Sequence, residues 1–193
     1  MITRAQVAKA ALWQLLFVVR GTSRERVRAA SEEGLMLLRG FTPAQMRELV
    51  AEALEPVLRP LVYDEPLRLV ERHRELGEPS FIVSAALQEV VDAMADDLGF
   101  DGALGTVCEV EDGVYTGRGV RSLHGVHKAA AVRDLAREHG YELTESTAYS
   151  DSHTDLPFLE AVGNPFAVNP DRELRRVAAE RGWPVLRFGA RAA

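Results

Sequence analysis

Residues 146–168 read STAYSDSHTDLPFLEAVGNPFAV. Within this segment, 146–150 and 166–168 are short apolar runs typical of buried strands, and 156–161 is predicted to be a short helix between them. Short apolar strands that alternate with helices are typical of a mostly parallel sheet covered by helices on both faces. The segment therefore predicts an α/β fold.

The same alternation of strands and helices continues on both sides of this segment, over residues 59–193. Glycines follow several of the helical stretches, and the turn Glu111-Asp112-Gly113 between two apolar runs is typical of a β-hairpin. The further predicted elements are helices at 65–76, 87–98, 128–139 and 172–181, and strands at 80–84, 103–110, 114–118 and 185–188.

Residues 2–58 have helical patterns and nothing that resembles a strand. The apolar run at 10–19 is about half as long as a membrane span requires. No small-residue cleavage site follows it, so we predict a buried helix rather than a signal peptide. Thr42 and Pro43 are typical of a helix start. We therefore predict two domains, a helical cap over 1–58 and an α/β core over 59–193.

Charge and cysteine content exclude several classes of protein. The net charge is -6, and the Lys and Arg residues are scattered along the chain. This predicts no nucleic-acid partner and no electrostatic attachment to a membrane. The one cysteine, Cys108, cannot form an intrachain disulfide, and its apolar neighbours predict a small core side chain rather than a reactive thiol. We predict a cytoplasmic protein.

Polar residues near the ends of predicted strands are the first candidates for a site, because ligands of α/β sheets bind beyond the carboxyl ends of the strands. Ser84 follows a strand and could donate to a phosphate oxygen, or it could simply cap the next helix. Lys128 enters a helix at its N-terminus, which suits an anion in front of it, although an exposed lysine is the simpler interpretation. His124 and His127 could suggest zinc, but no cysteine lies nearby.

Asp151 and Asp155 are the most informative candidates, because two carboxylates stand four residues apart directly after a strand. Hard oxygen ligands of this kind suit Mg²⁺, with Asp151 touching the metal and Asp155 orienting ligands behind it. The alternative is a capped turn into the helix at 156. The neighbours Asp151, Ser152 and His153 do not form a hydrolase triad, since triad members must converge in space.

The order Ser84, Lys128, then Asp151 and Asp155 resembles motifs II, III and IV of the haloacid dehalogenase superfamily, and within it the phosphoserine-phosphatase-like subfamily IB. The resemblance covers essentially the whole chain and is strongest from about residue 60 onward. The segments that carry it besides these four residues are Tyr63-Asp64-Glu65, Ile82-Val83-Ser84-Ala85, Asp112-Gly113-Val114-Tyr115-Thr116-Gly117, Tyr149-Ser150-Asp151-Ser152, residues 159–171 (LEAVGNPFAVNPD) and Gly182-Trp183-Pro184-Val185.

The resemblance implies a Rossmann-like core with a helical cap inserted after the first strand, and Mg²⁺-dependent hydrolysis of a small phosphorylated metabolite through an aspartyl-phosphate. Ser84, together with Ala85, would bind the phosphoryl oxygens. Lys128 would neutralise charge on the phosphate and the nucleophile, and would share the binding of the substrate. Asp151 would ligate Mg²⁺, with Asp155 supporting the metal and the catalysis.

The chain departs from the family pattern in one respect. Family members open with a strand that ends in D-x-D-x-[TS] and supplies the nucleophile, and no D-x-D is present in these 193 residues. We therefore expect the first core strand to be missing. Three explanations remain open: a truncated sequence, a natural non-catalytic relative that acts as a binding module, or a strand supplied by another chain, for instance in a homodimer.

The substrate cannot be read from the sequence, because the cap selects it in this family. Arg20, Arg39 and Arg47 are only generic candidates for contacting an acidic group, and a solvated helix residue is the simpler interpretation of each.

Overall fold

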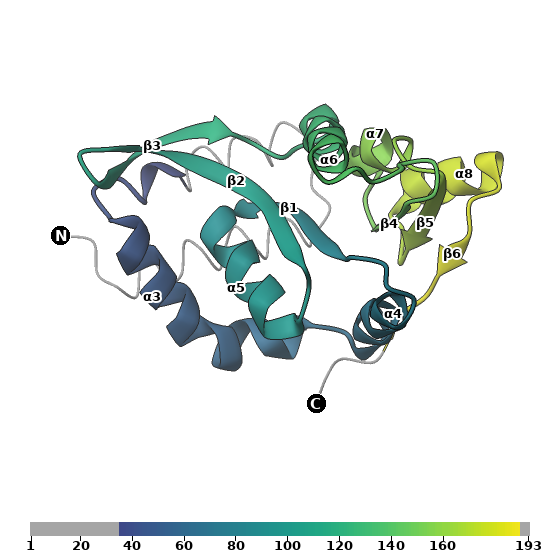
Figure 1. The fold of residues 1–193 in the computed structure, drawn as a ribbon, viewed down its shortest axis with the longest axis horizontal. Helices are drawn as coiled ribbons and strands as arrows, with labels where there is room; N and C mark the ends of the chain where they lie inside the picture. Colours follow the sequence, from purple (N-terminus) through teal and green to yellow (C-terminus); the bar gives the residue numbers. More distant parts are fainter. Residues whose placement is uncertain (1–34, 190–193) are drawn as a thin grey trace. The chain divides into compact units, whose positions relative to one another are not determined.

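The computed structural model describes residues 35–189. The chain forms two compact units, Met1–Ser122 with Ala190–Ala193, and Leu123–Gly189 (Figure 1). Predictions for residues 1–34, which include the apolar run at 10–19 and Arg20, lie outside the described residues. The proposed division into a cap and a core at residue 58 stays a prediction.

The first unit contains a three-stranded sheet in the order β1-β2-β3. Strand β1 runs parallel to β2, and β2 and β3 form an antiparallel hairpin. The hairpin turns at Asp112 and Gly113, whose φ angles of 50° and 79° are those that a tight two-residue turn requires. The elements are α3 (Pro43–Ala53), a π-helical turn (Leu54–Leu58), a 3₁₀ turn (Arg59–Leu61), α4 (Asp64–Glu75), β1 (Phe81–Leu87), α5 (Gln88–Leu98), β2 (Gly102–Glu111) and β3 (Val114–Arg121).

Helix α3 begins where the sequence predicts. Thr42 accepts a hydrogen bond from the Gln45 N–H, and the Gln45 side chain accepts one from the Thr42 N–H, which makes a capping box. Pro43 occupies the first helical position, where its missing N–H costs nothing. The predicted start of this helix is confirmed.

The core of the first unit lies where α3 and α5 meet the sheet (Figure 1). Helix α5 approaches β2 closely. A Cβ at Gly105 would stand only 2.6 Å from the Cα of Gln88, so only glycine fits there. Cys108 belongs to this core, which confirms its prediction as a buried side chain. The buried members are Leu35, Leu38, Met46, Leu49, Val50, Leu58, Leu87, Val90, Cys108 and Tyr115.

The second unit contains a parallel three-stranded sheet in the order β4-β5-β6. Helix α7 packs beside β4 and β5, and α8 packs against β5 (Figure 1). Because the strands are parallel, the residues that follow β4 and β5 emerge at the same edge of the sheet. The elements are α6 (Val126–His139), β4 (Thr147–Ser150), a 3₁₀ turn (His153–Asp155), α7 (Leu156–Leu159), β5 (Asn164–Val168), α8 (Arg172–Arg181) and β6 (Val185–Leu186).

The predicted α/β fold is confirmed, and most predicted elements end within about three residues of the observed ones. The main differences are in β1 and β3, which continue to Leu87 and Arg121 rather than ending at Ser84 and Arg118. None of the helices described between residues 35 and 189 has the length and apolar composition of a membrane span. That a first core strand is missing stays a prediction.

Candidate active site

The segment that follows β4 is a tight turn rather than an extended loop. Strand β4 ends at Ser150, and a 3₁₀ turn over His153–Asp155 leads directly into α7. The Ser152 hydroxyl accepts a hydrogen bond from the Thr154 N–H, which caps this turn. The turn brings the Asp155 carboxylate within hydrogen-bond distance of Ser150, the last residue of β4, while Asp151 follows the strand directly and is exposed.

Asp155 is buried, with 8% of its surface exposed, and its carboxylate has two donors. The Lys128 ammonium lies 2.6 Å from Oδ2 of Asp155, and the Ser150 hydroxyl donates to the same oxygen at 2.8 Å. The ring of Phe158 stands 5.9 Å from the ammonium. A buried ion pair costs desolvation on both sides and persists when further hydrogen bonds satisfy it, as the hydroxyl does here.

Lys128 occupies the first turn of α6 and is as buried as its partner, at 8% exposure. The interpretation of Lys128 as an exposed residue is therefore wrong, because its anion is supplied by Asp155. The preceding Gly125 has φ 53°, a conformation that favours glycine, and a Cβ there would stand 3.7 Å from the Thr154 carbonyl. The α6 start and the 3₁₀ turn thus pack closely together.

His124 stands at the start of α6, and His127 follows in its first turn. Burial lowers the pKa of His124, and the nearby ammonium of Lys128 lowers it further, which favours a neutral imidazole. His127 is exposed. Among residues 35–189 no group of three or more His, Cys, Asp or Glu is arranged to hold a metal.

Asp151 differs from Asp155 in its surroundings. Its side chain lies at the surface, but atoms packed around the carboxyl exclude enough water to raise its pKa, and the charge of Asp155 raises it further. The Lys128 ammonium and the Asp151 N–H act in the opposite direction. A carboxylate held near a second one is stabilised by a cation, and Mg²⁺ is commonly bound through only one or two carboxylates. The oxygen chemistry of Asp151 fits this metal.

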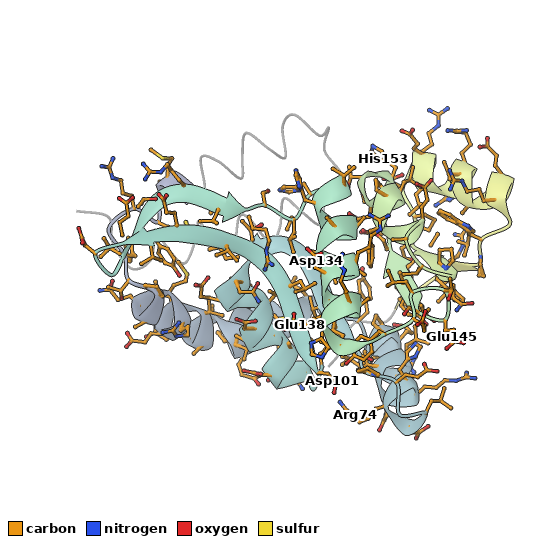
Figure 2. All side chains as sticks on the ribbon, turned by 45° about the horizontal axis from the view of Figure 1, so that its top comes forward. Arg74, Asp101, Asp134, Glu138, Glu145 and His153 are labelled. Carbon is orange, nitrogen blue, oxygen red and sulfur yellow. The ribbon has the colours of Figure 1, made fainter. Side chains whose placement is uncertain are left out.

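Asp171 and His153 also belong to this cluster, although the sequence did not point to them. Asp171 follows β5 and caps α8 by accepting from the Leu174 N–H. It also accepts from both the N–H and the ring Nδ1 of His153, each at 2.8 Å, and Figure 2 marks His153 on the turn before α7. The available signal was the helix-cap position of an aspartate after a predicted parallel strand.

Ser84 and Ala85 lie in the first unit. The pairing of β1 with β2 shifts between Val83 and Leu87, so both residues sit in an irregular part of the strand, a feature often found near sites. The Ser84 hydroxyl accepts from the Ala86 N–H at 3.2 Å, and the Ala85 carbonyl accepts from Thr106 at 2.8 Å. Leu87 precedes α5 directly, so the interpretation of Ser84 as a helix cap is wrong.

The structure thus brings Lys128, Ser150 and Asp155 together in the second unit, with Asp151 beside them. That Ser84 and Ala85 join this group stays a prediction. Arg39 and Arg47 are exposed side chains, as the simpler interpretation of them expects.

Comparisons with known proteins identify the family of the chain. The haloacid dehalogenase-like hydrolase family matches residues 2–160. The inhibition of morphological differentiation protein of Streptomyces azureus is 41% identical over 189 residues, which are 97% of this chain and 68% of that protein. A probable phosphatase of Mycobacterium tuberculosis is 40% identical over 188 residues, which are 97% of this chain and 66% of that protein. The chain therefore belongs to the haloacid dehalogenase-like hydrolase family, and it spans about two thirds of the length of these relatives.

Solved structures give the same result for the fold. A protein of unknown function from Bordetella pertussis is similar with a TM-score of 0.76 and 31% identity, over 86% of this chain and 74% of that one. A probable phosphoserine phosphatase from Vibrio cholerae is similar in fold, with a TM-score of 0.64 and 18% identity, over 97% of this chain and 52% of that one. The α/β fold is that of phosphoserine-phosphatase-like members of the family.

Proposed function

We propose that the protein is a Mg²⁺-dependent phosphatase that hydrolyses a small phosphorylated metabolite. The observation that carries the proposal is the buried group of Lys128, Asp155 and Ser150 next to the surface carboxylate of Asp151. Such a group combines a fixed cation for a phosphate with a carboxylate suited to a metal ion. The names of the relatives, among them a probable phosphatase, support this assignment.

Each residue of the group has a distinct part in the proposal. Asp151 would ligate Mg²⁺, which when bound supplies positive charge that neutralises phosphate oxygens. Asp155 holds the Lys128 ammonium in one place, and the ammonium would neutralise negative charge on the phosphate. The Ser150 hydroxyl and the Lys128 ammonium both donate to Oδ2 of Asp155, and the hydroxyl fixes the orientation of this carboxylate.

Ser84 and Ala85 complete the proposal as the phosphate-binding residues of the first unit. The irregular pairing around them supports this, because a regular strand would engage their backbone groups in the sheet ladder. We also propose that residues 1–58 form the helical cap that selects the substrate, and that the protein works in the cytoplasm.

A colorimetric phosphatase assay with Mg²⁺ tests the proposal on this chain and on any longer form that the gene encodes. We expect Asp151→Asn to abolish Mg²⁺-dependent turnover in whichever form is active. Asp134→Asn is the matched control, since Asp134 is an exposed residue of α6 that pairs with Arg137 on the same helix. Equal loss in both variants, or no turnover in any folded form across a broad panel of phosphomonoesters, would contradict the proposal.

A second candidate function is a binding module without catalysis. The absence of a D-x-D motif from these 193 residues favours the binding module, because that motif supplies the nucleophile in members of the haloacid dehalogenase family. Calorimetric titration with inorganic phosphate in the presence of Mg²⁺ separates the candidates. Phosphate binding that needs Lys128, in a protein that turns over none of the panel, would support the binding module.

A further inference from the structure

Asp171 makes more hydrogen bonds than its place at a helix end requires. An N-cap residue needs one side-chain acceptor, and Oδ1 of Asp171 fills that role for the Leu174 N–H at 2.8 Å. The second oxygen, Oδ2, accepts from the N–H and from the ring Nδ1 of His153, each at 2.8 Å. These two bonds join the start of α8 to the turn that follows β4, eighteen residues earlier in the chain.

The pair has a defined polarity. An ionised carboxylate only accepts, so the ring Nδ1 of His153 carries the proton and donates. The other ring nitrogen faces the Glu173 carboxylate at 3.9 Å.

A return hydrogen bond ties the same two segments together in the opposite direction. The Asp171 N–H donates to the Asp151 carbonyl at 2.9 Å. The turn is therefore held at Asp151 by a backbone bond and at His153 by a side chain. Its far end, Asp155, is held by Lys128 and Ser150. The backbone of the turn is therefore held at Asp151, at His153 and at Asp155.

We propose that His153 and Asp171 are positioning residues that hold the turn over residues 151–155 so that Asp151 presents its carboxylate to the cation. This inference rests on the proposed function for the identity of the cation. Groups behind a metal ligand fix its orientation, and their loss typically weakens metal binding by about 10–100-fold. Neither residue needs to touch the metal or the substrate.

Three variants separate positioning from helix capping. Asp171→Ser keeps an acceptor for the Leu174 N–H, because serine is as good an N-cap as aspartate, but its short side chain cannot reach His153. His153→Ala removes the ring donor without touching the cap. His153→Asn restores a donor near the place of Nδ1. Arg176→Gln is the matched control, an exposed residue of α8 paired with Glu180.

Two measurements are made on each variant of the whole protein. Amide hydrogen exchange of residues 151–155 is followed without metal, and Mn²⁺ affinity is measured by electron paramagnetic resonance. We expect Asp171→Ser and His153→Ala to speed exchange of the backbone amide at position 153 and to weaken Mn²⁺ binding about tenfold. His153→Asn should recover most of both, and Arg176→Gln should change neither, with thermal unfolding little altered in Asp171→Ser.

The outcomes that overturn the inference are distinct from those that overturn the proposed function. Unchanged exchange of the turn in Asp171→Ser and His153→Ala would show that the pair does not hold it. Faster exchange with unchanged Mn²⁺ affinity, while Asp151→Asn abolishes Mn²⁺ binding, would show that holding the turn does not position the ligand. If Asp151→Asn leaves Mn²⁺ binding unchanged, the metal assignment itself is wrong, and the exchange data still decide whether the pair holds the turn.

Discussion

Among residues 35–189, each unit contains a polar pair packed among apolar side chains, and the two pairs differ in charge. In the first unit, the Tyr115 hydroxyl donates to the Glu89 carboxylate at 2.5 Å, with Tyr115 only 1% exposed. In the second unit, the Lys128 ammonium pairs with Asp155 at 2.6 Å. A phenol and a carboxylate join helix α5 to strand β3, whereas two full and opposite charges join α6 to the turn after β4.

The difference distinguishes a pair that packs a core from a pair to which the proposed function assigns a part in the chemistry. Burying two charges costs more than burying one, and apolar side chains of similar volume would do as well for stability alone. The charged pair stands beside Asp151, at the carboxyl end of a parallel strand where ligands bind. The Tyr115 pair adjoins the core that contains Cys108, and its Glu89 lies in the first turn of α5, just after β1 ends.

The largest expected effect comes from removing one charge of the second pair. Lys128→Met leaves the Asp155 carboxylate buried without its cation, which should cost about 3–5 kcal/mol of unfolding free energy. Chemical denaturation measures this cost. The double variant Lys128→Met with Asp155→Leu should regain most of it and still lack phosphatase activity. If the double variant is as unstable as the single one, the Lys128–Asp155 pair is needed for stability in itself, which would contradict the distinction between the two pairs.

A smaller loss is expected in the first unit. Tyr115→Phe removes the donor to Glu89, a carboxylate whose Oε2 is already buried without a hydrogen bond among residues 35–189, and should cost about 1–3 kcal/mol. Activity per folded molecule should stay within about twofold, because neither residue of this pair belongs to the proposed site. A loss greater than that of Lys128→Met, or a selective loss of kcat, would reverse the distinction between the two pairs.

The surface carboxylate should behave in the opposite way to both buried pairs. Burial and the charge of Asp155 raise the pKa of Asp151, so its ionised form is held at some cost to the fold. Asp151→Asn should therefore leave the unfolding free energy within about 0.5 kcal/mol of the original, or slightly improve it, while Mn²⁺ binding is lost. Denaturation of the metal-free protein measures this, and a large destabilisation would identify Asp151 as a structural residue.

The smallest expected effect concerns the ionisation of Tyr115. It has no consequence at neutral pH and appears only in alkali. Burial and the Glu89 carboxylate raise the pKa of Tyr115 well above its ordinary value of 10.0. A group whose pKa is raised by folding contributes stability that is complete below the ordinary pKa and is lost as the pH rises above it. Absorbance titration at the tyrosinate band should find one tyrosine that stays protonated until alkaline unfolding, and Tyr115→Phe should remove this late step.

Local features explain how much of the fold could be predicted. The Thr42 cap, the Asp112-Gly113 turn and the helix over Arg172–Arg181 follow from residues within a few positions of each other, and all three are observed. The extension of β1 to Leu87 was missed because a strand that contains an irregular pairing has no simple alternation in its sequence. The polar residues after β4 could be named as candidates because the pattern of their types and spacing is local as well.

The sequence by itself determined the types and order of the elements, the family, and the carboxylates that could bind a cation. Only the tertiary structure decided that Asp155 is the buried partner of Lys128, twenty-seven residues away, and that Asp171 and His153 hold the turn between the two acids. The physical reason is that residues i and i+4 after a strand look alike in sequence. Which of them is buried depends on the helix packed against the strand end and on the neighbouring strand, and both come from distant parts of the chain.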